Sequence, residues 1–165
     1  KRVFYESSAK VPMILAGPGL PRGERDMTRR DSKALTSLMD LYPTMLELAG
    51  VESKSHLKRW GRSLLPVVRN EPSAGHQQII SELATSVMIR TANCKLVFDA
   101  EQDGVQQLFN LRNDPRELSN LAGVPGYEAT ALELVSRITA HRIAMTQYTH
   151  DKEERRVQRV RVPGA

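Results

Sequence analysis

Apolar stretches between positions 76 and 111 constrain the fold of this chain more than any other feature. Three of them are bounded by turn-forming residues: HQQIISEL, VMIRTANCKLVFDA and VQQLFNL. The second is long enough for two strands, and Ala92-Asn93 in its middle is suited to a hairpin turn. Four short strands that follow one another along the chain predict an antiparallel sheet.

A long amphipathic helix is expected after this sheet, over residues 127–147. Its apolar residues recur at helical spacing: Leu132, Val135, Ile138 and Ile143. A helix with one apolar stripe needs a surface to cover, and the predicted sheet supplies it. The tail after it, DKEERRVQRVRVPGA, has four arginines in seven residues. We expect a solvated, disordered end there, with binding of an anionic partner as the alternative.

The N-terminal part has a different character. VPMILA at 11–16 is apolar throughout and is followed by GPGLPRG, which is typical of a strand buried on both faces of a parallel sheet. A helix is expected next, starting near Ser32 or Ser37 and ending at Gly50. Pro43 indicates either a helix that begins near Leu41 or a kink. This strand has no parallel neighbours in the sequence.

The predicted fold class is therefore α/β, or more narrowly an α+β fragment. A strand and a helix from the edge of a larger α/β sheet precede a small four-stranded antiparallel sheet covered by a long C-terminal helix. We expect four segments: the end of an α/β domain, a connection with a short apolar insert, the sheet-and-helix subdomain, and a basic tail. Their predicted ranges are 1–52, 53–75, 76–150 and 151–165.

The bulk composition excludes some classes of function. The formal charge of +5, from 24 basic and 19 acidic residues, is too low to indicate a dedicated nucleic-acid binder. No apolar run reaches the ~18 residues of a membrane span, so no membrane partner is expected. The single cysteine, Cys94, cannot form an internal disulfide and is interpreted as a small buried hydrophobe.

The order of short motifs resembles the C-terminal part of the sulfatases, within the alkaline phosphatase superfamily. The motifs run K-x-x-x-Y-E, V-P-M-I, P-G, S-L-M-D-L-Y-P-T-M-L-E-L-A-G-V, G-R-S-L-L-P, M-I-R-T-x-x-x-K-L-V and L-F-N-L-x-x-D-P-x-E-x-x-N-L. The resemblance covers residues 1–121 directly and the long helix by position. Each fragment is weak alone, but seven of them in the family order make coincidence an unsatisfactory explanation.

This resemblance implies a role for Lys1 as a contact to the sulfate group, because it stands four residues before the Tyr-Glu pair. A fixed cation there would stabilise charge that develops on the transferring group. The family also uses a formylglycine made in a C/S-x-P-x-R motif and a divalent metal, usually calcium, held by acidic residues. Both are implied for the full-length protein, but neither motif occurs in this chain, so no metal ligands are assigned here.

The sequence also offers functional candidates that are supported by fewer observations than Lys1. His76 and Arg90 are substrate-binding candidates, because family members place substrate contacts from this subdomain near the active-site mouth. Three acidic residues in turn or helix-start motifs are interpreted as structural, with local hydrogen bonding expected for the last: Asp40, Asp114 and Glu117. Trp60 either covers the connection or stacks on a substrate ring, and the first interpretation is preferred.

The predicted function is that of the C-terminal third of a sulfatase, inactive alone, acting in the whole protein on a sulfated sugar or small molecule. Its expected partner is an upstream catalytic domain, and self-association through exposed apolar residues is a second expectation. Hydrolysis of phosphonate or phosphate monoesters, and a non-catalytic interaction module with a basic tail, remain as alternatives. The periplasm and the cytoplasm of a bacterium are both compatible with the sequence.

Overall fold

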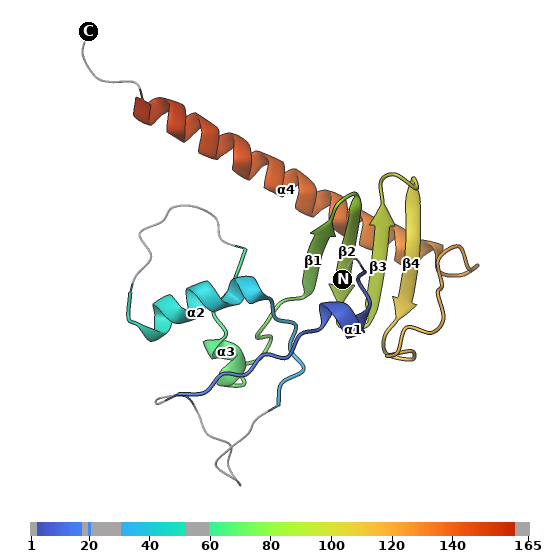
Figure 1. Cartoon of the computed structure of the whole chain (residues 1–165), viewed down its shortest axis with the longest axis horizontal. Coiled ribbons are helices and arrows are strands. Elements are labelled where there is room, and N and C mark those ends of the chain that lie inside the picture. Colours follow the sequence, from blue (N-terminus) through green and yellow to red (C-terminus); the bar gives the residue numbers. More distant parts are fainter. Residues whose placement is uncertain (1–2, 18–19, 21–30, 52–59, 161–165) are drawn as a thin grey trace.

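The computed structural model describes residues 3–17, 20, 31–51 and 60–160, with residues 148–160 described by their backbone alone (Figure 1). A four-stranded sheet forms its centre, with a long helix on one face. The elements in chain order are α1 (Glu6–Ala9), η1 (Leu38–Asp40), α2 (Leu41–Leu48), α3 (Leu65–Val68), β1 (Gln78–Leu83), β2 (Ser86–Thr91), β3 (Cys94–Asp99), β4 (Gly104–Asn110) and α4 (Glu128–Val160).

The sheet is an antiparallel meander in the order β1-β2-β3-β4, as the sequence predicted. Ile89 in β2 pairs with Leu96 in β3, which in turn pairs with Leu108 in β4. β2 ends at Thr91 and β3 begins at Cys94, so the predicted hairpin turn at Ala92-Asn93 is confirmed. A register shift between Val97 and Phe98 interrupts the β3–β4 ladder.

Helix α4 covers one face of this sheet and closes the main core. Leu134 and Ile138 pack on a row of strand residues, namely Val87, Ile89, Leu96 and Leu108. The predicted stripe was only partly right, because Leu132 and Ile143 are exposed. Ala131 in the helix and Tyr127 just before it also pack against this core. A search for large aliphatic residues overlooks both.

The N-terminal segment covers the opposite face of the sheet. Because side chains alternate along a strand, Met88 and Val97 point away from α4, and both pack against Phe4. The ring of Tyr5 lies 5.9 Å from that of Phe109. Figure 1 shows α1 at the sheet on the side where β2 and β3 lie. The sheet therefore lies between α4 and residues from the start of the chain.

The prediction of a strand at residues 11–16 is wrong for the chain as described. Residues 10–17 form neither helix nor strand, and Val11, Ile14 and Leu15 are exposed. A strand that is apolar on both faces needs neighbours that pair with its backbone. The described residues provide none there, since the four strands pair with one another.

The helical segment after residue 31 starts later than the earliest expectation. Ser37 caps η1, and α2 begins at Leu41 with Pro43 in its first turn, so no kink is needed. Gly50 ends the helix with φ of 64°, and its N–H binds the carbonyl of Glu47. The next N–H, of Val51, binds the carbonyl of Leu46. This pattern is a Schellman motif.

Helix α4 extends to Val160, well beyond the predicted end at residue 147. The expectation of a disordered tail is therefore wrong as far as Val160, while residues 161–165 lie outside the described residues. Glutamate, arginine, lysine and glutamine dominate this stretch, and all four are good helix formers that can extend a helix already nucleated on the sheet. Of the helices that the structure describes, none combines the length and apolar character needed to cross a bilayer.

Candidate functional site

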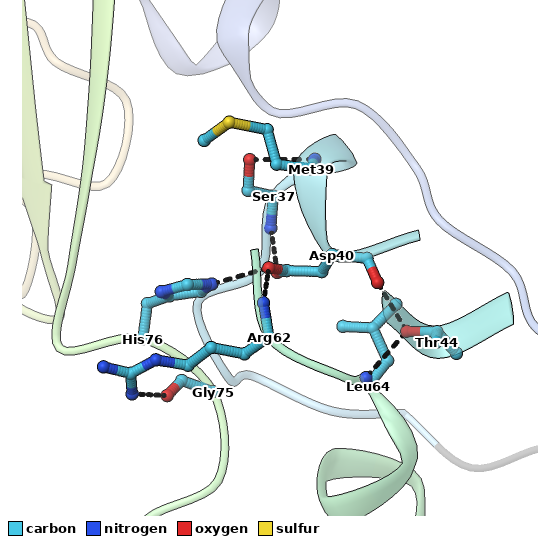
Figure 2. Close-up of polar contacts among 8 residues, drawn as sticks. All are labelled: Ser37, Met39, Asp40, Thr44, Arg62, Leu64, Gly75 and His76. Atoms are coloured by element: carbon cyan, nitrogen blue, oxygen red, sulfur yellow. Dashed lines mark hydrogen bonds and ion pairs between the residues drawn. The ribbon is translucent and has the colours of Figure 1, made fainter. Parts of the chain in front are cut away.

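Two buried polar clusters that share no residue contain the described site candidates His76 and Arg90. The first surrounds Asp40, which is 1% exposed (Figure 2). Its Oδ2 accepts the N–H of Ser37 at 2.7 Å, and its Oδ1 accepts the N–H of Arg62 at 2.8 Å. His76 Nε2 lies 2.8 Å from the same Oδ1. We call these four residues and Thr44 the Asp40 cluster.

Thr44 links the same helix start to the connection that follows. Its hydroxyl donates to the carbonyl of Asp40 at 2.5 Å and accepts the N–H of Leu64 at 2.8 Å. The backbones approach closely nearby, because a Cβ added to Gly61 would lie 2.1 Å from the carbonyl oxygen of Met39. The Asp40 cluster therefore ties η1, α2 and the connection together, whereas the sequence indicated only a structural carboxylate at the start of a helix.

His76 is the residue through which this cluster reaches the sheet. Its backbone N–H donates to the carbonyl of Leu35 at 2.8 Å, which makes an isolated bridge just before β1. A carboxylate only accepts, so the proton between His76 and Asp40 is on Nε2. In the neutral ring only Nδ1 is then left to accept a hydrogen bond. The side chain is 11% exposed, so its access to a substrate is narrow.

The second cluster surrounds Lys95, whose side chain is completely buried on the face of the sheet opposite α4. Its Nζ lies 2.6 Å from Glu6 Oε1 and 2.6 Å from Glu117 Oε1, and it donates to the carbonyl of Phe4 at 2.8 Å. Glu117 Oε2 also accepts the N–H of Glu6 at 2.6 Å. We call Glu6, Arg90, Lys95 and Glu117 the Lys95 cluster.

Arg90 completes this cluster from the neighbouring strand. It pairs with Lys95 in the β2–β3 register, and its Nε lies 3.4 Å from Glu6 Oε1. Its Nη1 donates to the carbonyl of Thr91. Burial by itself would raise the pKa of Glu6, but the hydrogen bond from Lys95 and the charges of Lys95 and Arg90 hold that pKa below its usual value.

Glu117 differs from its expected local role. Its φ of 59° turns the backbone in a way that is uncommon for a residue with a side chain, and its carboxylate meets Lys95 rather than its own loop. Asp114 takes the local role, since its carboxylate accepts the N–H of Ser119 at 2.8 Å. Backbone N–H groups, that of Ser119 first, lower the pKa of Asp114. The prediction of a local role is therefore confirmed for the Asp114 carboxylate and wrong for that of Glu117.

The structure does not bring the sequence candidates together. Lys1 lies outside the described residues. Among those described, the Asp40 cluster with His76 and the Lys95 cluster with Arg90 share no member. Trp60 packs edge-on against His141 in α4, with ring centroids 4.8 Å apart, which agrees with the covering role. Cys94 is half-buried beside the main core, and burial raises the pKa of its thiol.

Lys95 is the residue that sequence analysis missed. The sequence did contain an indication of it, because Lys95 lies inside a predicted strand and directly precedes three apolar residues: Leu96, Val97 and Phe98. No acidic partner is near it in the sequence, since the two carboxylates come from far along the chain in either direction. A buried lysine almost always has such partners, so its presence in the strand predicts them without naming them.

The residues described do not suit a divalent cation. No three histidine, cysteine, aspartate or glutamate side chains among them are gathered in a way that could hold one. The carboxylates of both clusters are already engaged by N–H donors or by Lys95. Neither cluster is therefore assigned a calcium ion or a formylglycine.

Comparison with known proteins gives consistent matches. Residues 1–144 match the family described as N-sulphoglucosamine sulphohydrolase, C-terminal. Human arylsulfatase K is 36% identical over 138 residues, which are 74% of this chain and 24% of that protein. The choline-sulfatase of Rhizobium meliloti (strain 1021) is 37% identical over 131 residues, covering 76% of this chain and 24% of that protein. The chain spans about a quarter of the length of these relatives.

Solved structures agree in fold. A putative sulfatase from Bacteroides thetaiotaomicron VPI-5482 superimposes with a TM-score of 0.61 at 27% identity, covering 94% of this chain and 33% of that one. BT4656, solved with its substrate D-glucosamine-2-N,6-O-disulfate, gives 0.52 at 28%, covering 67% and 24%. The phosphonate monoester hydrolase SpPMH from Silicibacter pomeroyi gives 0.56 at 27%, covering 68% and 26%.

Proposed function

Since this chain belongs to the sulfatases and corresponds to their C-terminal part, we propose that it completes a longer enzyme that hydrolyses sulfate esters. The observation that carries the proposal is the family match over residues 1–144. Identities of 36% and 37% to an arylsulfatase and a choline-sulfatase support it. In this proposal residues 1–52 are the end of the upstream domain, 53–75 the connection and 76–150 the subdomain, and α4 continues across residue 150 into the basic tail.

The substrate class in this proposal is a sulfated sugar or a sulfated small molecule. The sugar is favoured by BT4656, whose substrate carries sulfate on glucosamine. The small molecule is favoured by the choline-sulfatase relative. In either case the reacting group is an anionic sulfate ester, which needs fixed positive charge near the oxygens where charge develops.

Lys1 supplies one such charge in this proposal, as a contact to the sulfate group. The formylglycine and the calcium ion that the family uses would come from the upstream part of the protein. His76 and Arg90 are the candidate substrate contacts from this subdomain. Asp40 already engages His76, so His76 would act through Nδ1. Arg90 would act through Nη2, because its Nε faces Glu6 and its Nη1 donates to the carbonyl of Thr91.

The upstream domain also explains several exposed apolar side chains. Large ones on α2 and before it face solvent: Val11, Ile14, Tyr42, Met45 and Leu48. The relatives are about four times as long as the matched segment, which supports an upstream domain large enough to cover them. We assign these residues to the contact with the upstream domain.

A phosphonate monoester hydrolase is the second candidate, favoured by the fold shared with SpPMH. The two functions differ in the ester that the whole protein prefers. The test is therefore the full-length protein assayed with D-glucosamine-2-N,6-O-disulfate, p-nitrophenyl sulfate and p-nitrophenyl phosphate. Preferential release of sulfate supports the first function, and preferential turnover of the phosphate ester contradicts it.

A substitution in the same protein tests the role of Lys1. Lys1→Ala should lower kcat/KM on the order of 10²–10³-fold, as expected when a charge-stabilising group is removed. Its thermal midpoint should hardly move, because most surface substitutions change stability by under about 0.5 kcal/mol. Lys1→Arg should restore activity only in part. Lys10→Ala removes an exposed lysine nearby and serves as control. Turnover of Lys1→Ala within about threefold of wild type would remove Lys1 from the site.

A further inference from the structure

Lys95, in the third strand of the sheet, binds the carbonyl of Phe4, which precedes it by 91 positions. The Lys95 ammonium has three N–H donors, and three acceptors lie within 2.8 Å of it. Two of those acceptors, the Phe4 carbonyl and the Glu6 carboxylate, belong to the N-terminal segment. Lys95 therefore uses most of its bonding capacity to hold that segment.

The charges in this cluster balance, with Arg90 and Lys95 facing Glu6 and Glu117. A balanced buried cluster is a weak source of stability, because the loss of hydration offsets much of the attraction between its ions. Apolar residues of similar size would fill the same space without that cost. Ion pairs and hydrogen bonds differ from apolar packing in being directional, so they fix where their partners lie.

Three consecutive residues are fixed in this way, each by a different contact to the same sheet face. Phe4 buries its ring on the sheet and gives its carbonyl to Lys95, while the Tyr5 ring lies against Phe109. Glu6 binds Lys95 through its side chain and Glu117 through its N–H. Only two residues of sequence lie between Phe4 and Lys1, the proposed sulfate contact.

We infer that Lys95 is a positioning residue: from inside the C-terminal sheet it fixes the Phe4–Glu6 backbone, and the turnover of the whole enzyme depends on this docking. The inference rests on the proposed function, because Lys1, the proposed sulfate contact, precedes Phe4 in the same segment of the sequence. The C-terminal subdomain then has a direct task in the reaction of the whole protein, although its described residues carry none of the family's nucleophile or metal-binding motifs.

The test replaces Lys95 with methionine in the full-length protein, which keeps most of the length of the side chain and removes its charge. Turnover is measured with p-nitrophenyl sulfate and D-glucosamine-2-N,6-O-disulfate, and amide hydrogen exchange is followed by segment. We expect kcat to fall on the order of 10²-fold, as for a misplacement of about 1 Å, with a much smaller change in KM. Exchange should rise in residues 4–9, while β1 and α4 stay protected.

Glu6→Gln is the second variant, since Lys95→Met leaves two carboxylates without their cation and is the more damaging of the two to folding. It removes one charge, keeps the shape of the side chain, and should give the same pattern with a fall in kcat of about tenfold. Glu82→Gln is the matched control. It breaks an exposed ion pair of the same sheet, with Arg142 at 2.8 Å, and should leave kcat and exchange of residues 4–9 unchanged.

The possible outcomes test the positioning role, the docking of the N-terminal segment and the proposed function separately. A folded Lys95→Met or Glu6→Gln protein with kcat within about threefold of wild type overturns the positioning role. Unchanged exchange in residues 4–9 overturns the docking of the segment by Lys95. A wild-type protein that releases sulfate from neither probe overturns the proposed function, and the positioning role with it, whereas the exchange data still decide whether Lys95 holds the segment.

Discussion

The Nε2 of His76 lies 2.8 Å from Oδ1 of Asp40, a residue that precedes it by 36 positions and is itself almost completely buried. This contact joins the start of helix α2 to the start of strand β1. The same oxygen accepts the N–H of Arg62, so one carboxylate organises three segments of the chain. The histidine that sequence analysis singled out as a substrate contact is thus also a structural link.

Replacement of Asp40 by alanine should destabilise the fold strongly. It leaves the N–H groups of Ser37 and Arg62 and the ring of His76 without their acceptor in a buried place. The expected loss is on the order of 3 kcal/mol in the free energy of unfolding, measured by urea denaturation. Glu47→Gln, on the exposed side of α2, should change it by under about 0.5 kcal/mol. A similar, small effect of both substitutions would contradict the structural role of Asp40.

Two leucines on α4 should differ sharply in their contribution to stability. Leu134 is 3% exposed and packs in the main core, whereas Leu132, on the same helix, is 69% exposed. We expect Leu134→Ala to cost about 2–5 kcal/mol, and Leu132→Ala under about 0.5 kcal/mol. Thermal or urea unfolding of both variants measures the difference. Equal losses would mean that α4 presents another face to the sheet.

Stability should fall in mild acid, in part through Glu6. The pKa of Glu6 in the folded protein lies below its ordinary value of 4.5, so protonation favours the unfolded chain. Its contribution is fully present above that ordinary value and is lost as the pH falls through the lowered one. Glu6→Gln should therefore flatten the decline of the unfolding free energy below about pH 4.5. Some decline should remain, since the pKa of Asp114 is also lowered. An unchanged slope would show that Glu6 is not held by Lys95.

The chain produced without upstream residues should associate with itself. Ile14 is 89% and Met45 64% exposed, and both would be covered by the upstream domain in the proposed enzyme. We expect the mass from light scattering to rise with concentration up to about 100 µM, a range in which exposed apolar surface promotes association. The double substitution Ile14→Ser and Met45→Ser should reduce it, and Leu132→Ser should not. A monodisperse monomer would instead show that these side chains are tolerated in water.

Sequence patterns identified the elements that depend on neighbours in the chain. The four strands, their hairpin turn and the glycine end of α2 follow from local alternation and turn chemistry. Contacts between distant residues were beyond such patterns. Lys95 meets Glu6 and Glu117 only because the sheet brings residues from both directions to one face. The apolar run at 11–16 was misassigned because its strand partners are not among the described residues.

Helix α4 has a practical consequence for handling this protein. Its ion pair with the sheet through Arg142 is followed by helix as far as Val160, and Figure 1 shows that end extending away from the strands. Eighteen residues at 1.5 Å each give about 27 Å of helix beyond that contact. An affinity tag attached directly after Val160 would therefore lie away from both faces of the sheet. Immobilised this way, the protein would keep its N-terminal side open to soluble ligands.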